Sequence, residues 1–163
     1  MTGTPPDLVL VSQSIQPSSD SSIAVPPLPA DFDLLVRRTS YTQRGSVLSR
    51  HVSFVVASAL PSRIMVALRE ARMDLSDVAA TEGVRKLDFS FGRAGTEKGV
   101  DEAILEGFGA DRFPPDFVWR RYVGTMRGAP VFVILEALAS ELPASARQAK
   151  RERCRARPHT QAF

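Results

Sequence analysis

The chain has 163 residues, of which 44% are hydrophobic and 24% are charged. This is enough for one domain with a real core, and no apolar run reaches the roughly 18 residues that a membrane helix needs. The N-terminus lacks a basic segment followed by an apolar one, which argues against a secretion signal. The single cysteine, Cys154, cannot form an internal disulfide. We therefore expect a cytoplasmic protein with no membrane partner.

The positive charge is concentrated near the C-terminus. Residues 144–158 contain a single acid, Glu152, and six basic residues: Arg147, Lys150, Arg151, Arg153, Arg155 and Arg157. We predict a disordered N-terminus over residues 1–6, a folded domain over residues 7–143 and a flexible basic tail over residues 144–163. The tail could bind nucleic acid weakly, but no aromatic residues are interleaved with its cations. A nucleic-acid partner is otherwise not expected.

The N-terminal half has the pattern of antiparallel strands. Strands are predicted over residues 7–15, 32–42 and 48–57, because β-branched and apolar residues recur there. Prolines and serines between residues 17 and 30 indicate a loop, and the Gln43–Ser46 segment indicates a tight turn.

Two helices are predicted in the middle of the chain. After Pro61, the apolar residues Ile64, Met65, Leu68 and Ala71 recur at helical spacing. A second short helix is expected around Val78 and Ala79, capped by either Asp74 or Ser76.

The second half of the chain predicts three more strands and a helical turn. One strand is expected over residues 84–92 and the helical turn over residues 100–107. The last two strands lie within residues 118–136 and are joined by a turn at Arg127-Gly128-Ala129-Pro130. We therefore predict an α+β fold, with an antiparallel sheet of about six strands and short helices packed on one face.

Glu136 lies within an otherwise apolar run. Burying a carboxylate there is costly unless a cation or a ligand pairs with it. Two arginine pairs also lie on predicted strands, at residues 37–38 and 120–121. Since neighbouring strand residues face opposite ways, one arginine of each pair points inward. These arginines are either surface cations or partners of Glu136 in a dry pocket, where a guanidinium can hold a ligand carboxylate.

Several kinds of chemistry are disfavoured by the sequence. No glycine-rich phosphate loop follows a predicted strand, and no serine lies in a G-x-S-x-G context. His51 and His159 have no other ligand at metal-binding spacing. We interpret His51 as a strand residue with a satisfied ring, and we do not expect a metal site.

The order of these segments resembles the chorismate pyruvate-lyase family. The resemblance rests on Val36-Arg37-Arg38, the turn at Gly45, the Leu60-Pro61 helix start, and Arg120-Arg121-Tyr122 followed by Arg127-Gly128-Ala129-Pro130 and Glu136. It spans roughly residues 8–141. The sequence is also similar to the effector-binding domains of certain helix-turn-helix repressors, which share the chorismate lyase-like fold.

The resemblance implies a specific reaction and site. Such a lyase eliminates pyruvate from chorismate and leaves 4-hydroxybenzoate, without a cofactor. By motif, Arg37 would bind the ring carboxylate and Glu136 the hydroxyl, both as catalytic and substrate-binding residues. A second arginine of the family falls near Arg50 or Ser53, and we assign it to Arg50 as a further substrate-binding residue.

Two alternatives to the lyase hypothesis follow from the same resemblance. The chain could be a non-catalytic domain that senses a small carboxylate, related to the repressor effector domains. It could also be an inactive, truncated paralogue, because family lyases carry an N-terminal helical segment that covers the pocket. The distinction depends on whether Glu136 faces the same side of the sheet as Arg37. The sequence leaves the oligomeric state open.

Overall fold

The computed structural model describes residues 6–18, 28, 32–108 and 116–138. The predicted disordered N-terminus lies almost entirely outside these residues, and the basic tail lies wholly outside them. The described residues form one antiparallel sheet in the order β1-β2-β3-β6-β5-β4. Its strands are β1 (Asp7–Pro17), β2 (Asp33–Gln43), β3 (Ser46–Val56), β4 (Arg85–Arg93), β5 (Val118–Met126) and β6 (Ala129–Leu138). The predicted α+β class and strand number are confirmed.

Two tight hairpins set the register of the central strands. Arg44 and Gly45 join β2 to β3, and Arg127 and Gly128 join β5 to β6, with positive φ at all four residues. Two-residue turns with positive φ at both positions match the twist of the strands that they join. The second turn is therefore shorter than predicted, since Ala129 and Pro130 already belong to β6.

The helices are short and follow the predicted patterns. A 3-10 turn over Ala57–Ala59 leads to α1 (Ser62–Arg69), and α2 covers Leu75–Thr81. Of the two predicted caps for α2, Asp74 is the one used, in a capping box with Asp77. The last helix, α3 (Lys98–Phe108), is longer than the expected helical turn.

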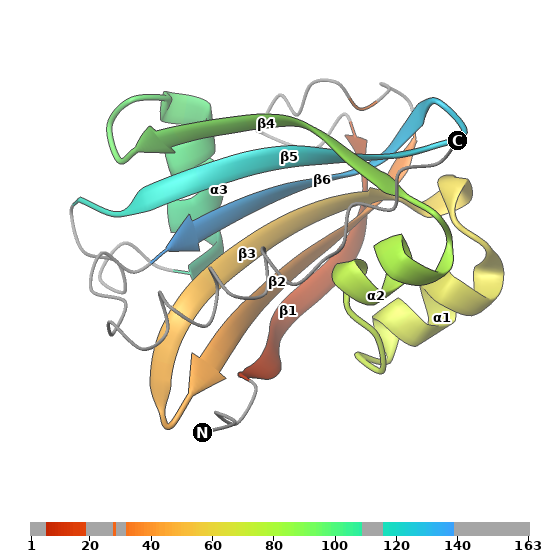
Figure 1. Ribbon diagram of the computed structural model, residues 1–163, viewed down its shortest axis with the longest axis horizontal. Helices are drawn as coiled ribbons and strands as arrows, with labels where there is room; N and C mark the ends of the chain where they lie inside the picture. Colours follow the sequence, from red (N-terminus) through yellow and green to blue (C-terminus); the bar gives the residue numbers. More distant parts are fainter. Residues whose placement is uncertain (1–5, 19–27, 29–31, 109–115, 139–163) are drawn as a thin grey trace, which may run out of the picture.

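Helices cover both faces of the sheet, whereas the sequence predicted helices on one face. One core cluster joins α3 residues such as Ile104 to Val36 and Phe54, and the other joins α1 and α2 residues to Leu35 and Val55. Because neighbouring strand residues face opposite ways, the two clusters lie on opposite faces. Figure 1 shows α1 and α2 together at one end of the twisted sheet, away from α3.

Two glycines in the sheet make room for large aromatic rings. Gly124 on β5 lies opposite Phe132 on β6, and Gly92 on β4 lies opposite Trp119 on β5. A Cβ atom at either glycine would overlap the ring of its partner. These positions need glycine because of close packing.

We predict that Gly124→Ala destabilises the fold, by about 1–3 kcal/mol, because the buried ring of Phe132 has no space to move aside. Gly99→Ala is the matched control, since nothing lies within 4 Å of its added Cβ in α3 and alanine favours helix. Urea unfolding of both variants measures the difference. Equal stability of the two variants would contradict the packing argument.

Candidate ligand-binding site

Arg37 and Glu136 lie on the same face of the sheet, the face that α1 and α2 cover. Arg37 shares its side of β2 with Leu35, and Glu136 shares its side of β6 with Ile134; both apolar residues belong to the α1–α2 cluster. Strand β3 separates them, with His51 opposite Glu136 and Ser53 opposite Arg37. Two strand spacings and one two-residue step put their backbones about 12 Å apart. The strand register therefore places Glu136 and Arg37 on the same side of the sheet.

A row of paired residues crosses three strands on this face. Arg120, Glu136 and His51 lie directly opposite one another on β5, β6 and β3. The Nε and Nη2 atoms of Arg120 both contact Oε2 of Glu136. The carboxylate is buried, while the Arg120 side chain is 29% exposed. The partner of Glu136 is therefore Arg120, and not Arg37 across the sheet.

His51 extends this row but does not form a catalytic relay. Its Nε2 atom lies 2.9 Å from the Ser49 hydroxyl oxygen and 3.9 Å from Oε1 of Glu136. A nucleophile relay needs the two ring nitrogens to serve the two partners separately, whereas here the same nitrogen faces both. The ring also packs on Tyr41, with centroids 5.0 Å apart. This supports the interpretation of His51 as a strand residue with a satisfied ring.

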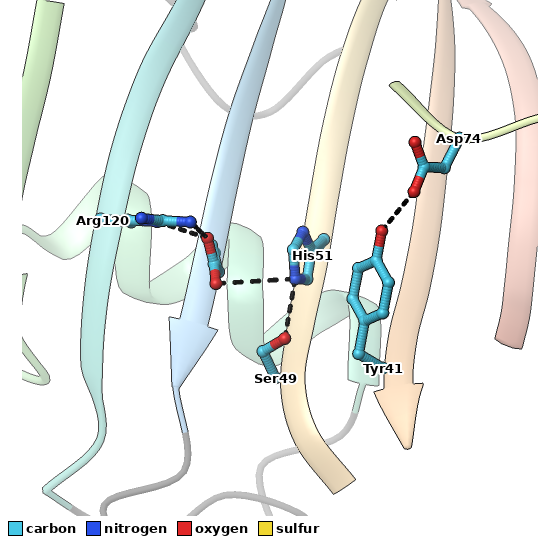
Figure 2. A network of polar contacts seen from close by, with 6 residues as sticks. Tyr41, Ser49, His51, Asp74 and Arg120 are labelled. Atoms are coloured by element: carbon cyan, nitrogen blue, oxygen red, sulfur yellow. Dashed lines mark hydrogen bonds and ion pairs between the residues drawn. The ribbon is translucent and has the colours of Figure 1, made fainter. Parts of the chain in front are cut away.

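Tyr41 connects the sheet to the start of α2. Its hydroxyl donates a 2.5 Å hydrogen bond to Oδ2 of Asp74, while Oδ1 of the same carboxylate accepts from the Asp77 backbone. Figure 2 shows Arg120, Ser49, His51, Tyr41 and Asp74 spread across the strands toward this helix. Burial, and next the hydrogen bond to Asp74, raise the pKa of Tyr41 far above its usual range. Asp74 thus caps α2 and also fixes it to the sheet.

Arg37 differs from the other charged groups on this face because none of the described acids forms an ion pair with it. Its side chain is almost fully buried at 2% exposure. The Nε and Nη2 atoms have no hydrogen-bond partner among the described residues. Burial lowers the pKa of the guanidinium, and the negative charge of Asp74 opposes that shift. Since arginine stays protonated in proteins, a buried positive charge remains with its donors unused.

The third predicted site residue, Arg50, is not brought together with the other two. It neighbours His51 on β3 and so points to the opposite face. Its guanidinium carbon lies 5.8 Å from the centre of the Phe108 ring on α3. Arg37 and Glu136 therefore share a face that Arg50 does not.

Some residues of this face were not singled out from the sequence. Tyr41 and Asp74 are 33 residues apart, and no local pattern links them. Arg120 could have been found from the sequence, because it belongs to an arginine pair on a strand expected next to Glu136.

Among the described residues, no group of three or more His, Cys, Asp or Glu could hold a metal ion. None of the helices within these ranges has the length and apolar character of a membrane span.

The chain has the chorismate lyase-like fold, as the effector domains of GntR-family regulators do. Three of the solved structures that it resembles are the following. The PhnF C-terminal domain matches with a TM-score of 0.55 and 13% identity, over 86% of each chain. The ligand-binding domain of a protein assigned to the GntR family in Bordetella bronchiseptica matches with a TM-score of 0.55 and 11% identity, over 85% of this chain and 89% of that one.

A GntR-family transcriptional regulator from Bacillus cereus matches with a TM-score of 0.57 and 5% identity, over 84% of this chain and 93% of that one. At these identities the likeness establishes the fold alone. No protein-family model matches the sequence, and a search of the curated proteins finds no significant relative.

We predict strong energetic coupling between Glu136 and Arg120. Glu136→Gln and Arg120→Met should each destabilise the fold by about 1–3 kcal/mol, because each removes one partner of a buried ion pair. The double variant should lose at least about 1 kcal/mol less than the sum of the two single losses. The exposed pair Lys98–Glu102 on α3 is the control, with an expected coupling below about 0.5 kcal/mol. Additive losses at Glu136 and Arg120 would contradict the assignment.

We also predict that the tyrosines resist ionisation in the folded state. The chain has two, Tyr41 and Tyr122, and burial raises the pKa of both above the usual 10.0. Their stabilising contribution is fully present below pH 10 and is lost as the pH rises toward the folded-state pKa. Tyrosinate absorbance should therefore appear together with cooperative unfolding, followed by circular dichroism. A simple titration near pH 10 with the fold intact would show that the rings are open to water.

Proposed function

We propose that this domain binds a small anionic molecule at Arg37 and acts as a ligand-sensing module without catalysis. The observation that carries the proposal is the buried guanidinium of Arg37, which has two nitrogen atoms without a hydrogen-bond partner among the described residues. A buried cation of this kind is costly unless an anion neutralises it. Its planar fork of donors suits a carboxylate or a phosphate.

The surroundings of Arg37 favour an external anion over an internal one. Both oxygens of Asp74 already accept hydrogen bonds, from Tyr41 and from the Asp77 backbone. Glu136 is held by Arg120 on the far side of β3. The oxygens of these two acids are thus directed at other donors, which leaves the Nε and Nη2 donors of Arg37 for a ligand carboxylate, although the charge of Asp74 is close enough to act on Arg37.

The fold comparisons support sensing over lyase chemistry. Among the similar structures, one is described as a ligand-binding domain and another as the effector domain of PhnF from Mycobacterium smegmatis. The first is the domain of a transcriptional regulator, and sensing of a small molecule is the function that we carry over to this chain. We propose a carboxylate as the ligand because the sequence resembles the chorismate pyruvate-lyase family, in which the residue matching Arg37 binds the ring carboxylate.

Chorismate elimination remains a second candidate, because Arg37 and Glu136 share one face, as the lyase resemblance requires. Its weakness is the ion pair with Arg120, which competes with a substrate hydroxyl for the carboxylate of Glu136. Incubation with chorismate tests this reaction directly. Formation of 4-hydroxybenzoate above the spontaneous background, and its loss in a folded Glu136→Gln variant, would establish the enzyme; background rates in both would exclude it.

We predict that Arg37→Met removes anion binding and stabilises the ligand-free protein. Binding of small carboxylates, sugar phosphates and amino acids should be screened by thermal shift and measured by calorimetry. For any anion that binds, affinity should fall at least about tenfold, as expected for a lost charge-assisted contact. In anion-free buffer the variant should gain about 1–3 kcal/mol of unfolding free energy, since an unmatched buried charge is removed.

Arg38→Met is the matched control for this experiment. Arg38 neighbours Arg37 on β2 and faces the α3 side of the sheet, so its substitution should leave anion affinity unchanged. The proposal fails if no anion binds, or if the affinity falls equally in the two variants.

A further inference from the structure

A second polar atom on the same face is buried without a partner. The Oε1 atom of Gln13, on edge strand β1, has no hydrogen-bond partner among the described residues. Gln13 lies directly opposite Arg37 in the β1–β2 register. Directly opposed residues of antiparallel strands have Cβ atoms about 5 Å apart on one face. The unused donors of Arg37 and the unused acceptor of Gln13 therefore belong to one location.

The orientation of the Gln13 amide is fixed from the other side. Its Nε2 group donates a hydrogen bond to the backbone carbonyl of Arg69, the last residue of α1. The last carbonyls of a helix have no partner within the helix, and a carbonyl can only accept. The amide nitrogen must therefore point to α1, which leaves Oε1 as an acceptor on the remaining side.

The two groups are complementary, yet no hydrogen bond joins them. Arg37 offers N–H donors at Nε and Nη2, and Gln13 offers a carbonyl oxygen, but all three atoms are unpaired. A direct hydrogen bond between Arg37 and Gln13 would satisfy both groups without any ligand. A third chemical group that accepts from Arg37 and donates to Gln13 would satisfy all three atoms.

We propose that Gln13 is a specificity-determining residue for the ligand that Arg37 binds, and that this ligand carries a hydrogen-bond donor next to its anionic group. The inference rests on the proposed anion-binding function. It narrows the ligand class to hydroxy acids, amino acids and similar molecules, in which a hydroxyl or ammonium group neighbours a carboxylate. An anion without such a donor would leave Oε1 of Gln13 buried and unpaired.

Matched probes test this specificity. Lactate and propionate differ only by the 2-hydroxyl group, and calorimetry should show that lactate binds about 10- to 100-fold more tightly, the effect expected for one unpaired buried acceptor. In Gln13→Leu the acceptor is absent, and the two affinities should become similar. Equal affinities in the wild-type protein, or an unchanged ratio in Gln13→Leu, would overturn the inference while anion binding at Arg37 still stands.

A second variant tests the location without any ligand. Gln13→Glu supplies a carboxylate opposite Arg37 but gives up the hydrogen bond to the Arg69 carbonyl. We therefore expect the substitution to be less destabilising with Arg37 present than in the Arg37→Met background, measured as melting temperature in anion-free buffer, together with at least tenfold weaker anion binding. Gln16→Glu is the control, because Gln16 pairs with Leu34 on the α3 side of the sheet and should give neither effect.

The outcomes separate the two proposals. If no anion binds the wild-type protein but Gln13→Glu is stabilised through Arg37, the two groups are neighbours and the proposed function is wrong. If anions bind through Arg37 but the effect of Gln13→Glu on stability does not depend on Arg37 and anion binding is not weakened, Gln13 does not line the site and this inference is wrong.

Discussion

The ion pair between Glu136 and Arg120 is the interaction on which the polar face of this sheet depends. A buried carboxylate on a central strand is tolerated because a guanidinium on the next strand contacts it directly. Figure 2 shows how His51, Ser49 and Tyr41 continue this polar region toward Asp74. With Glu136 and Asp74 both hydrogen-bonded to other groups, the Nε and Nη2 donors of Arg37 stay without a partner among the described residues.

The two arginines on this face have different roles in our proposal: Arg120 stabilises the fold and Arg37 binds the ligand. Arg120 is partly exposed and neutralises an acid, so it stabilises the fold. Arg37 is buried beside Gln13 with unused donors, which costs stability in the free protein. Charged groups in costly environments cluster at functional sites. Under the proposed function, an anion bound at Arg37 would recover this free energy, and its binding would be coupled to the stability of the whole domain.

The same geometry explains why the sensing function is preferred to the lyase reaction. The resemblance correctly predicted the fold, and Arg37 and Glu136 share a face as it required. A free carboxylate at Glu136 was also needed, but Arg120 holds it. The assigned second cation, Arg50, lies against Phe108 on the other face. Fold and residue types alone therefore do not establish a reaction.

Local patterns in the sequence determined the strands, the α1 and α2 helices and the burial of Glu136, because period-two and period-3.6 spacing depends only on near neighbours. The sequence also identified Arg37 as a candidate. Only the tertiary structure decided that α3 crosses to the opposite face, since an amphipathic helix does not specify which side of a sheet it covers. Strand order likewise decided that Arg120 pairs with Glu136 and that Gln13 lies opposite Arg37. These contacts join distant segments, and their polar partners carry no periodic signal along the chain.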